Sequence, residues 1–402
     1  MTIVLYVLIV MALVQGGVSL RDGVQNARYV RGYRKPGRQP ERAIVFCPVK
    51  GADPDLEVNA RSLLGQRYAP YRVVFLIDHI QDPAMRVLAS IPGAVVAAAG
   101  RSPVRGQKVH SLLEGIRKFG DEADVWVFAD ADARFPPDWL EELVAPLGAP
   151  GVGAATGYRW YVPEPGSLPS LLRSAWNATV AGLLGSGRNN FAWGGSTAIR
   201  REVFNEAGIA GLWEHAVSDD YALTGGVRGA GLRVAWVPAC LVPAYGSCTW
   251  RGLIEFTTRQ IKITRVYAPA VWRVGFLTTT LFNVTFLWLT ARALAGGWGF
   301  AIPWLLLYGL TVLRSWLRLG AAGRAVPDRS LRKHRWFYRL SAPLVALLYQ
   351  TNFILSLASR RIVWKNVAYT MVSPEETRVE WGHVSAEQTP PRAGPSRDEA
   401  AR

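Results

Sequence analysis

Two aspartates, Asp130 and Asp132, stand one residue apart directly after the apolar run VWVFA. That run is typical of a buried strand, so both carboxylates are expected at the strand's carboxyl end. Hard cations prefer carboxylate oxygens, and a bound Mg²⁺ or Mn²⁺ would bridge to a diphosphate and neutralise it. We therefore expect a metal site at Asp130 and Asp132. A solvated acidic turn is the alternative, since an Asp-x-Asp pair also arises by chance.

A second acidic pair, Asp219 and Asp220, lies between Ser218 and Tyr221 at the start of an expected helix. Adjacent carboxylates can divide two roles, because structural hydrogen bonds hold one while the other acts as a general base. A helix N-cap followed by favourable acidic residues in the first turn is the alternative interpretation.

One further acid and two basic residues stand where they could contact a nucleotide. Asp78 ends the strand-like run RVVFLI and could accept hydrogen bonds from a base or ribose; a turn or N-cap aspartate is the alternative. Arg259 and Lys262 are three residues apart on one expected helix face and could hold a departing diphosphate. Binding of lipid phosphates beside a membrane is the alternative for this basic pair.

Alternating strands and helices between about residues 43 and 245 must position these side chains. The runs 43–49, 72–78 and 124–130 are rich in apolar and β-branched residues and predict short buried strands, with helical patterns between them. Such alternation predicts an α/β domain with a mostly parallel sheet, which binds ligands at the carboxyl ends of its strands.

Apolar segments on both sides of this region predict membrane helices. Residues 2–20 carry no charge, are long enough to span a bilayer and precede a basic cluster, the pattern of an anchor with its N-terminus outside. A cleaved signal peptide is the alternative. Residues 274–295 and 299–318 predict two spans, and 340–358 predicts either a third span or a re-entrant segment. The side of the C-terminus stays open, because a third span would place the basic residues that follow it outside.

The formal net charge of +16 comes largely from basic residues that cluster beside the apolar segments. Such clusters keep a loop in the cytoplasm and attract anionic headgroups, so we expect membrane lipids as partners and a cytoplasmic middle region. No stripe of Lys, Arg and aromatic residues stands out in that region, so nucleic acid is not an expected partner. The clusters contain Arg21, Arg28, Arg31, Arg34, Lys35 and Arg38, and then Arg324, Arg329, Arg332, Lys333 and Arg335.

Cysteine and histidine usage narrows the chemistry further. Cys47, Cys240 and Cys248 form no CxxC pair, and this odd count in a cytoplasmic region predicts reduced thiols. Only 5 histidines are present, which disfavours a histidine-based metal or hydrolase site. The usual signatures of dinucleotide-binding turns, phosphate loops, nucleophile elbows and zinc proteases are also missing from the sequence.

Taken in chain order, these motifs resemble the inverting family 2 glycosyltransferases, and most closely their ceramide glucosyltransferase-like branch. The resemblance covers the chain from about residue 1 to residue 370. The residues that carry it are PVKG (48–51), Asp78, GQKVH (106–110), Asp130 and Asp132, WGGS (193–196), SDDY (218–221), Arg259 with Lys262, and RIVWKNVAY (361–369).

This resemblance implies an N-terminal anchor, a cytosolic GT-A domain and a hydrophobic C-terminal part, in the inner or plasma membrane of a bacterium. It also implies a nucleotide-sugar donor, expected to be a UDP-sugar. Asp220 would be the base with Asp219 as its neighbour, and Arg259 and Lys262 would act on the leaving group. The residues implied in binding donor and metal are Pro48, Lys50, Asp78, Lys108, Asp130 and Asp132, and Trp193, Gly194 and Gly195 would line the acceptor side.

One motif departs from the family pattern, R-x-x-R-W. Here Lys262 and Ile263 take the places of the arginine and the tryptophan. Lysine keeps the charge but loses the bidentate fork of arginine, and isoleucine offers no aromatic face for stacking. The family's donor and acceptor preferences therefore stay open for this chain.

The expected function is membrane-bound, metal-dependent transfer of a hexose from a nucleotide-sugar to a lipid hydroxyl, with inversion. A processive polysaccharide synthase and a catalytically decayed membrane scaffold with a sugar-nucleotide fold are the alternatives. The expected division of the chain is an anchor (1–22), a basic linker (23–42), a GT-A domain (43–270), transmembrane or interfacial helices (271–360), and a post-membrane segment with a disordered tail (361–402).

Overall fold

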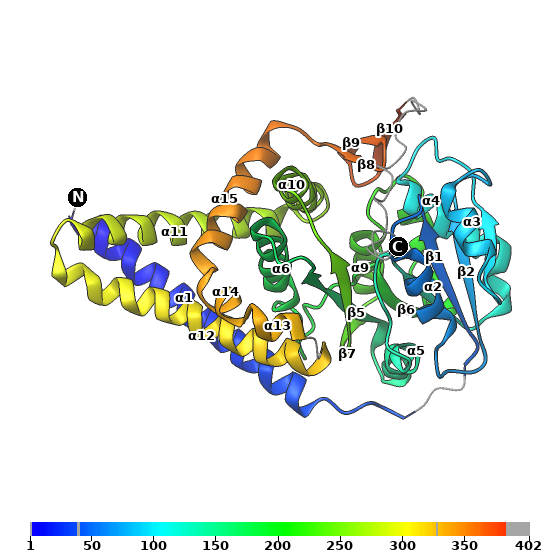
Figure 1. Cartoon of the computed structure of the whole chain (residues 1–402), viewed down its shortest axis with the longest axis horizontal. Coiled ribbons are helices and arrows are strands. Elements are labelled where there is room, and N and C mark those ends of the chain that lie inside the picture. Colours follow the sequence, from blue (N-terminus) through cyan, green and yellow to red (C-terminus); the bar gives the residue numbers. More distant parts are fainter. Residues whose placement is uncertain (1, 38–40, 327–328, 383–402) are drawn as a thin grey trace, which may run out of the picture.

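The computed structural model describes residues 2–37, 41–326 and 329–382. Two predictions lie outside the described residues. These are Arg38, assigned to the basic linker, and the tail from residue 383, predicted to be disordered. Within the described ranges, the chain forms an α/β domain from which three long helices extend to one side (Figure 1).

A seven-stranded sheet forms the centre of the domain, in the order β3-β2-β1-β4-β6-β5-β7. Four pairings are parallel (β1–β2, β1–β4, β2–β3 and β5–β7), and β6 runs antiparallel to both β4 and β5. This mixed, mostly parallel sheet confirms the predicted fold class. The strands are β1 Ala43–Val49, β2 Tyr71–Ile77, β3 Val95–Ala98, β4 Val125–Ala129, β5 Val152–Pro163, β6 Ser196–Arg200 and β7 Arg233–Gly246.

Helices cover both faces of the sheet, which explains why its central strands are continuous apolar runs. Alternate residues of β1 contribute to two separate cores: Val45 and Cys47 to one, Ile44 and Phe46 to the other. The first core contains residues of α2 (Leu56–Leu64), α3 (Pro83–Ala89), α5 (Trp139–Val144) and α6 (Leu168–Ala181). The second contains residues of α4 (Gln107–Phe119), α7 (Arg201–Glu206), α8 (Ile209–Trp213) and α9 (Asp219–Gly229).

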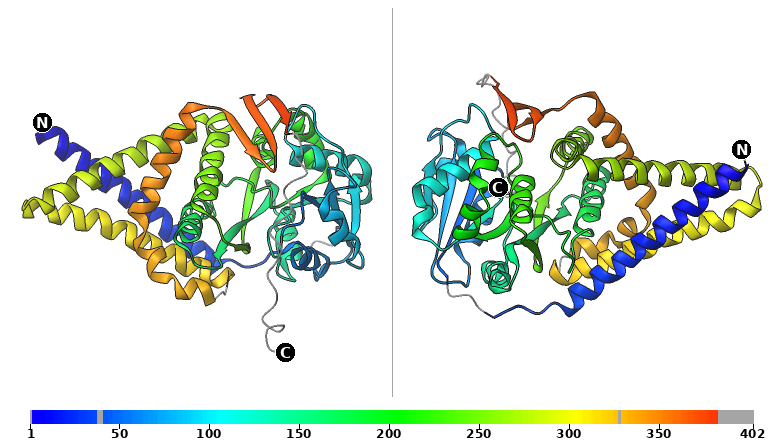
Figure 2. Two further views of the ribbon diagram at one scale, coloured as in Figure 1. Left: turned by 45° about the horizontal axis from the view of Figure 1, so that its top comes forward. Right: turned by 180° about the vertical axis from the view of Figure 1, so that it is seen from behind.

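Three helices are long and apolar enough to cross a membrane, in agreement with the predicted spans: α1 (Thr2–Gly32), α11 (Pro269–Leu294) and α12 (Ala301–Ala325). They lie side by side and lead away from the sheet, with the N-terminus at their far tip (Figures 1 and 2). Leu277, Leu294 and Ile302 are 65%, 84% and 65% exposed, as expected for side chains that face hydrocarbon.

The apolar segment predicted at 340–358 forms α15 (Ala342–Ala358), a shorter helix that runs across α11 and α12 at the domain side (Figure 1). Two short helices precede it, α13 (Arg329–Lys333) and α14 (Arg335–Leu340). The helix α10 (Trp250–Tyr267) connects β7 to α11.

The basic linker is shorter than the sequence predicts. The α1 helix continues to Gly32, so residues 23–32 are helical rather than part of a linker. Their docking on the domain explains the difference: Ala27 is buried, and the Tyr29 hydroxyl donates to the Trp236 carbonyl over 2.8 Å.

The segment after α15 forms a second, three-stranded antiparallel sheet, which the sequence does not predict. Its strands are β8 (Arg361–Trp364), β9 (Val367–Ser373) and β10 (Glu376–Trp381), in the order β10-β9-β8. This C-terminal sheet packs its apolar side chains with those of α10 and lies beside the domain, not beside the tip of the long helices (Figure 1).

Candidate functional site

The two acidic motifs meet at the carboxyl end of β4, and Lys108 joins them. The Lys108 ammonium lies 2.7 Å from Asp130 Oδ1 and 3.2 Å from Asp219 Oδ2. Asp130 directly follows β4, while Lys108 and Asp219 lie in the first turns of α4 and α9. Because these helices begin at the same sheet edge, residues far apart in the sequence share one cation.

Arg159 of β5 supplies a second cation that the sequence analysis missed. Its Nη1 lies 3.0 Å from Asp132 Oδ2 and 4.0 Å from Asp130 Oδ2. Although burial alone would raise the pKa of Asp130, Lys108 and Arg159 together hold this pKa below its usual value. A single arginine inside the otherwise apolar strand GYRWYVP was the available signal.

Asp219 and Asp220 have different surroundings, although they are neighbours in the chain. Asp219 is 6% exposed, and burial raises its pKa to about 6, against the opposing effect of Lys108. Asp220 is half-buried and faces the cavity, where its Oδ1 accepts hydrogen bonds from the Tyr221 backbone over 2.8 Å and from the Ser218 hydroxyl. Ser218 also caps α9 by accepting from Tyr221 N, so the N-cap interpretation holds as well.

Gly194 and Gly195, directly before β6, allow the backbone to approach this cluster closely. A Cβ atom on Gly195 would lie 2.5 Å from Asp130 Oδ2, and one on Gly194 would collide with the Asp219 carboxylate and lie 2.8 Å from Lys108 Nζ. Neither position has room for a side chain, and Trp193 beside them lines the cavity.

Gly194→Ala is expected to destabilise the protein by about 1–3 kcal/mol, the usual cost of overpacking, and to displace the Lys108–Asp219 pair. Thermal unfolding and sugar transfer would both be measured. Gly185→Ala is the matched control, because a Cβ there meets nothing within 4 Å. Equal stability and equal activity of the two variants would contradict this interpretation of the close approach.

Asp78 and Lys50 form the part of the site next to β1 and β2. Asp78 follows β2, is 7% exposed, and lies 2.5 Å from the Lys50 ammonium. Lys50 and Pro48 line the cavity, whereas Asp78 lies behind Lys50. Asp78 is therefore connected to the cavity through its ion pair with Lys50.

The basic pair on α10 is divided between two environments. Arg259 lines the cavity, with its guanidinium 5.6 Å from the Phe256 ring. Lys262 instead donates to the Ser359 hydroxyl and the Arg361 carbonyl, over 3.1 and 2.9 Å. The expectation that Lys262 acts on the leaving group is not supported by this placement.

Helix geometry explains the division. Successive residues of an α-helix are rotated by roughly 100° about its axis. Residues 256, 259, 260 and 263 therefore share one face of α10, and residue 262 lies outside that face. That side faces the cavity. Three-residue spacing was therefore too weak a criterion, because it ignores which face the rest of the fold buries.

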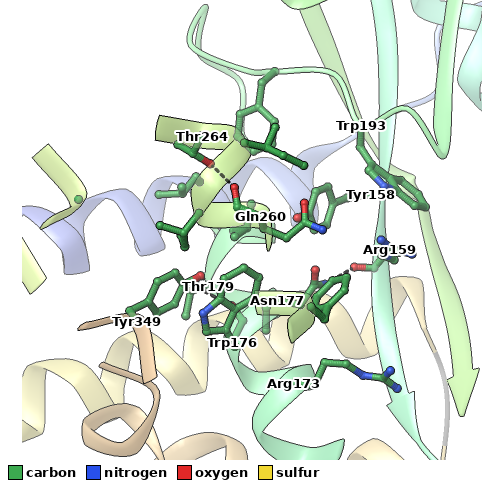
Figure 3. A pocket seen from close by; sticks show the side chains of 18 of the residues that line it. Tyr158, Arg159, Arg173, Trp176, Asn177, Thr179, Trp193, Gln260, Thr264 and Tyr349 are labelled. Atoms are coloured by element: carbon green, nitrogen blue, oxygen red, sulfur yellow. Dashed lines mark hydrogen bonds between the residues drawn. The ribbon is translucent and has the colours of Figure 1, made fainter. Parts of the chain in front are cut away.

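One cavity of about 1360 Å³ connects this acidic cluster with the long helices. Figure 3 shows Trp193 and Arg159 at one side of it and Tyr349 of α15 at the opposite side. Beyond Tyr349 the wall is formed by residues of the apolar helices: Ala12, Gln15 and Gly16 of α1, Gly275, Thr278 and Phe282 of α11, and Leu307, Leu310 and Thr311 of α12.

Asp130 and Asp132 fit a metal that is shared with a substrate. Among the described residues, no third His, Cys, Asp or Glu joins them. Mg²⁺ is commonly held by one or two carboxylates, with phosphate oxygens and water completing its shell. The Asp132 side chain is 51% exposed and so presents an oxygen to the cavity.

Two solved structures are similar to this chain at low identity. The mannosyltransferase PcManGT from Pyrobaculum calidifontis, in complex with GDP-Man and Mn²⁺, matches over 88% of this chain and 97% of its own, with 17% identity and a TM-score of 0.49. Glucosyl-3-phosphoglycerate synthase from Mycobacterium tuberculosis, in complex with Mn²⁺ and UDP-glucose, matches over 58% of this chain and 84% of its own, with 17% identity and a TM-score of 0.37.

A protein-family model described as glycosyl transferase family 21 matches residues 4–377. Its number differs from the family 2 indicated by the motifs, but both descriptions agree on a glycosyltransferase. The match includes the three long helices, the cluster around Lys108 and the C-terminal sheet up to β10. Because it spans nearly all of the described fold, the chain belongs to glycosyl transferase family 21.

Proposed function

We propose that this glycosyltransferase moves a hexose from a nucleotide-sugar, a UDP-sugar in the first instance, to the hydroxyl of a membrane lipid, with inversion at the anomeric carbon. The observation that carries the proposal is the continuous cavity: Asp130, Asp132 and Asp220 line one end, and helices able to cross a membrane line the other. The ceramide glucosyltransferase-like branch indicated by the motifs belongs to the same proposal.

The donor binds at the carboxyl ends of β1, β2 and β4 in this proposal. Lys50, held by Asp78, faces the nucleotide, and Lys108 holds Asp130 in place. Asp130 and Asp132 would hold a divalent ion, whose charge would stabilise the diphosphate leaving group. Arg159 and Arg259 line the same cavity and add positive charge towards the leaving group.

Asp220 acts as the general base. Its carboxylate takes the proton of the acceptor hydroxyl while the hydroxyl oxygen bonds to the anomeric carbon, and the bond from that carbon to the diphosphate breaks. Both carboxylates line the cavity, but Asp219 is buried and paired with Lys108, so the half-buried Asp220 is the one assigned as base. A single displacement of this kind inverts the configuration.

The acceptor enters between the long helices. Apolar side chains of α11 and α12 line the distal part of the cavity, together with polar residues that include Thr278, Arg314 and Arg318. A lipid tail lying there would direct its headgroup towards Trp193 and Asp220.

The domain lies on the cytoplasmic side in this proposal. Basic residues near the C-terminal end of α1 and in α13 and α14 lie at the domain end of the long helices, whereas the N-terminus lies at their tip (Figure 1). Basic residues favour the cytoplasmic side of a membrane, which places the N-terminus outside. We propose the inner or plasma membrane of a bacterium as its location.

Purified protein would be incubated with bacterial lipid extract, Mg²⁺ or Mn²⁺ and a panel of UDP-sugars, and the extracts compared by mass spectrometry. The expected result is one new lipid that carries a single added sugar, together with consumption of one donor. A ladder of long products on a gel would favour a processive synthase instead. No donor binding by calorimetry would favour a decayed scaffold.

A further inference from the structure

The C-terminal sheet reaches the proposed donor site from outside the domain. Ile362 and Trp364 of β8, Lys365 of the following turn and Tyr369 of β9 all line the cavity that contains Asp130 and Asp132. Ile362 and Trp364 are two residues apart and therefore share one face of their strand. A segment that follows every apolar helix thus forms one wall of a site built from the first half of the chain.

Specific contacts hold this wall in place. The Trp381 indole donates to the Ser102 carbonyl over 2.9 Å, and the Lys50 ammonium lies 4.6 Å from the Trp381 ring centroid. The Tyr369 hydroxyl accepts from Gln107 N over 3.2 Å, one residue before Lys108. The sheet is therefore fastened to the loops that follow both β1 and β3.

The β8–β9 turn places the Lys365 ammonium next to the loop that follows β1. Lys365 and Asn366 have φ angles of 46° and 66°, the paired left-handed conformation of a tight two-residue hairpin turn. Lysine adopts this conformation rarely, and such exceptions cluster at functional sites. The Lys365 ammonium lies 2.8 Å from Asp53 Oδ1 and would lie 4.0 Å from a Cβ on Gly51, in the loop directly after β1.

An aromatic face accompanies this cation. Trp364 packs against an apolar cluster formed by Val266, Ile362, Val367, Tyr369 and Met371, and Ile263 of α10 packs against the same cluster. The position at which the α10 motif lacks a tryptophan therefore shares an apolar cluster with a tryptophan supplied by β8. Lys262, meanwhile, is bound to the start of β8 instead of facing the cavity.

We propose that the β8–β9 hairpin completes the donor site: Lys365, positioned by Asp53, contacts the diphosphate of the nucleotide-sugar, and Trp364 forms the aromatic wall beside it. This inference rests on the proposed sugar transfer and assigns to the hairpin a cation and an aromatic face in place of those that positions 262 and 263 of α10 do not present. Lys365 donates to phosphate oxygens in the ground state and more strongly as the bond to the sugar breaks, because charge then develops on the diphosphate.

The experiment compares Lys365→Met with three other variants in the full-length protein. Loss of one charge-assisted contact is expected to lower kcat/KM for the donor roughly 10- to 100-fold. Lys365→Arg should restore much of the activity. Arg378→Met of β10, whose side chain is 73% exposed, is the matched control and should leave activity unchanged. Lys262→Met should have a smaller effect than Lys365→Met.

Binding measurements separate contact from structural support. Calorimetry would compare the nucleoside diphosphate of the active donor with the corresponding nucleoside. A phosphate contact predicts that Lys365→Met weakens the diphosphate and spares the nucleoside, whereas disruption of the sheet would weaken both. Trp364→Ala should lower donor affinity and, because it removes packing from the apolar cluster, also lower the thermal unfolding midpoint, whereas Trp364→Phe should restore much of both.

The outcomes distinguish the two proposals. An active wild type whose kcat/KM and diphosphate affinity survive Lys365→Met would overturn the assignment of Lys365 while leaving the proposed sugar transfer intact. A wild type that binds no sugar nucleotide would overturn both. Equal weakening of diphosphate and nucleoside would also count against the contact, because it would show support of the site and not recognition of phosphate.

Discussion

Asp220→Asn is expected to lower sugar transfer by roughly 10²- to 10⁴-fold, the usual contribution of a positioned general base. Asparagine has nearly the same shape and can still accept the hydrogen bond from Tyr221 N, but it cannot take a proton from the acceptor. Donor binding should change little, because the Lys108 pairs with Asp130 and Asp219 remain. Initial rates and calorimetric donor affinity would be measured together.

A fully exposed aspartate provides the control for this variant. Asp121 has a solvated side chain at the far end of α4, and Asp121→Asn should behave as the wild type. Wild-type turnover by Asp220→Asn would refute the base assignment. Loss of donor affinity in that variant would instead indicate that Asp220 holds the donor.

Asp132→Asn is expected to lower kcat/KM by roughly 10²- to 10³-fold and to abolish any stimulation by Mg²⁺ or Mn²⁺, since a metal bridging to a diphosphate contributes several kcal/mol to transition-state stabilisation. Chelation of divalent ions from the wild type should produce a similar loss that added metal reverses. The measurement is donor turnover across a metal titration.

Asp138→Asn is a matched control for this change, because the Asp132 and Asp138 side chains are both 51% exposed and each lies near one arginine. Asp138 pairs with Arg67 and does not line the cavity. Full metal-stimulated activity of Asp132→Asn would exclude Asp132 as a metal ligand. An unaltered rate after chelation of the wild type would exclude metal dependence altogether.

Residues at strand ends were the most predictable part of the site. Asp78 and Asp130 each follow a run of apolar residues whose pattern gives the strand directly, and parallel strands bring their carboxyl ends to one edge. The acidic pair at Asp219 was also recognisable, because a cap and an acidic first turn mark the start of a helix. Local patterns sufficed for these positions.

Arg159 and Lys262 depend on tertiary packing, which local patterns do not encode. Arg159 reaches Asp132 because β5 and β4 are separated only by β6, a sheet order that the sequence does not reveal. Lys262 lies on a helix whose rotation is set by the packing of Leu253 and Ile261 into the core. Spacing along a helix gives relative angles between residues but not the direction of the site.

The C-terminal sheet was missed for a related reason. Its strands are short and partly charged, and tertiary contacts order the segment, among them those of Tyr369 with the start of α4, of Trp381 with the loop after β3 and of its apolar side chains with α10. Likewise, α1 extends beyond its apolar part because Tyr29 packs on β7. Charge and composition alone suggested a linker and a disordered end.

The order of elements along the chain has a consequence for biosynthesis. Strands β8 to β10 leave the ribosome only after α1, α11 and α12. The β8–β9 hairpin nevertheless supplies one wall of the cavity whose acidic end lies at α4 and β4. A nascent chain therefore acquires this wall only once its helices have already been synthesised. For the same reason, a fragment limited to β1 through α10, without α1 and α11, would retain the acidic cluster but lack Trp364 and Lys365.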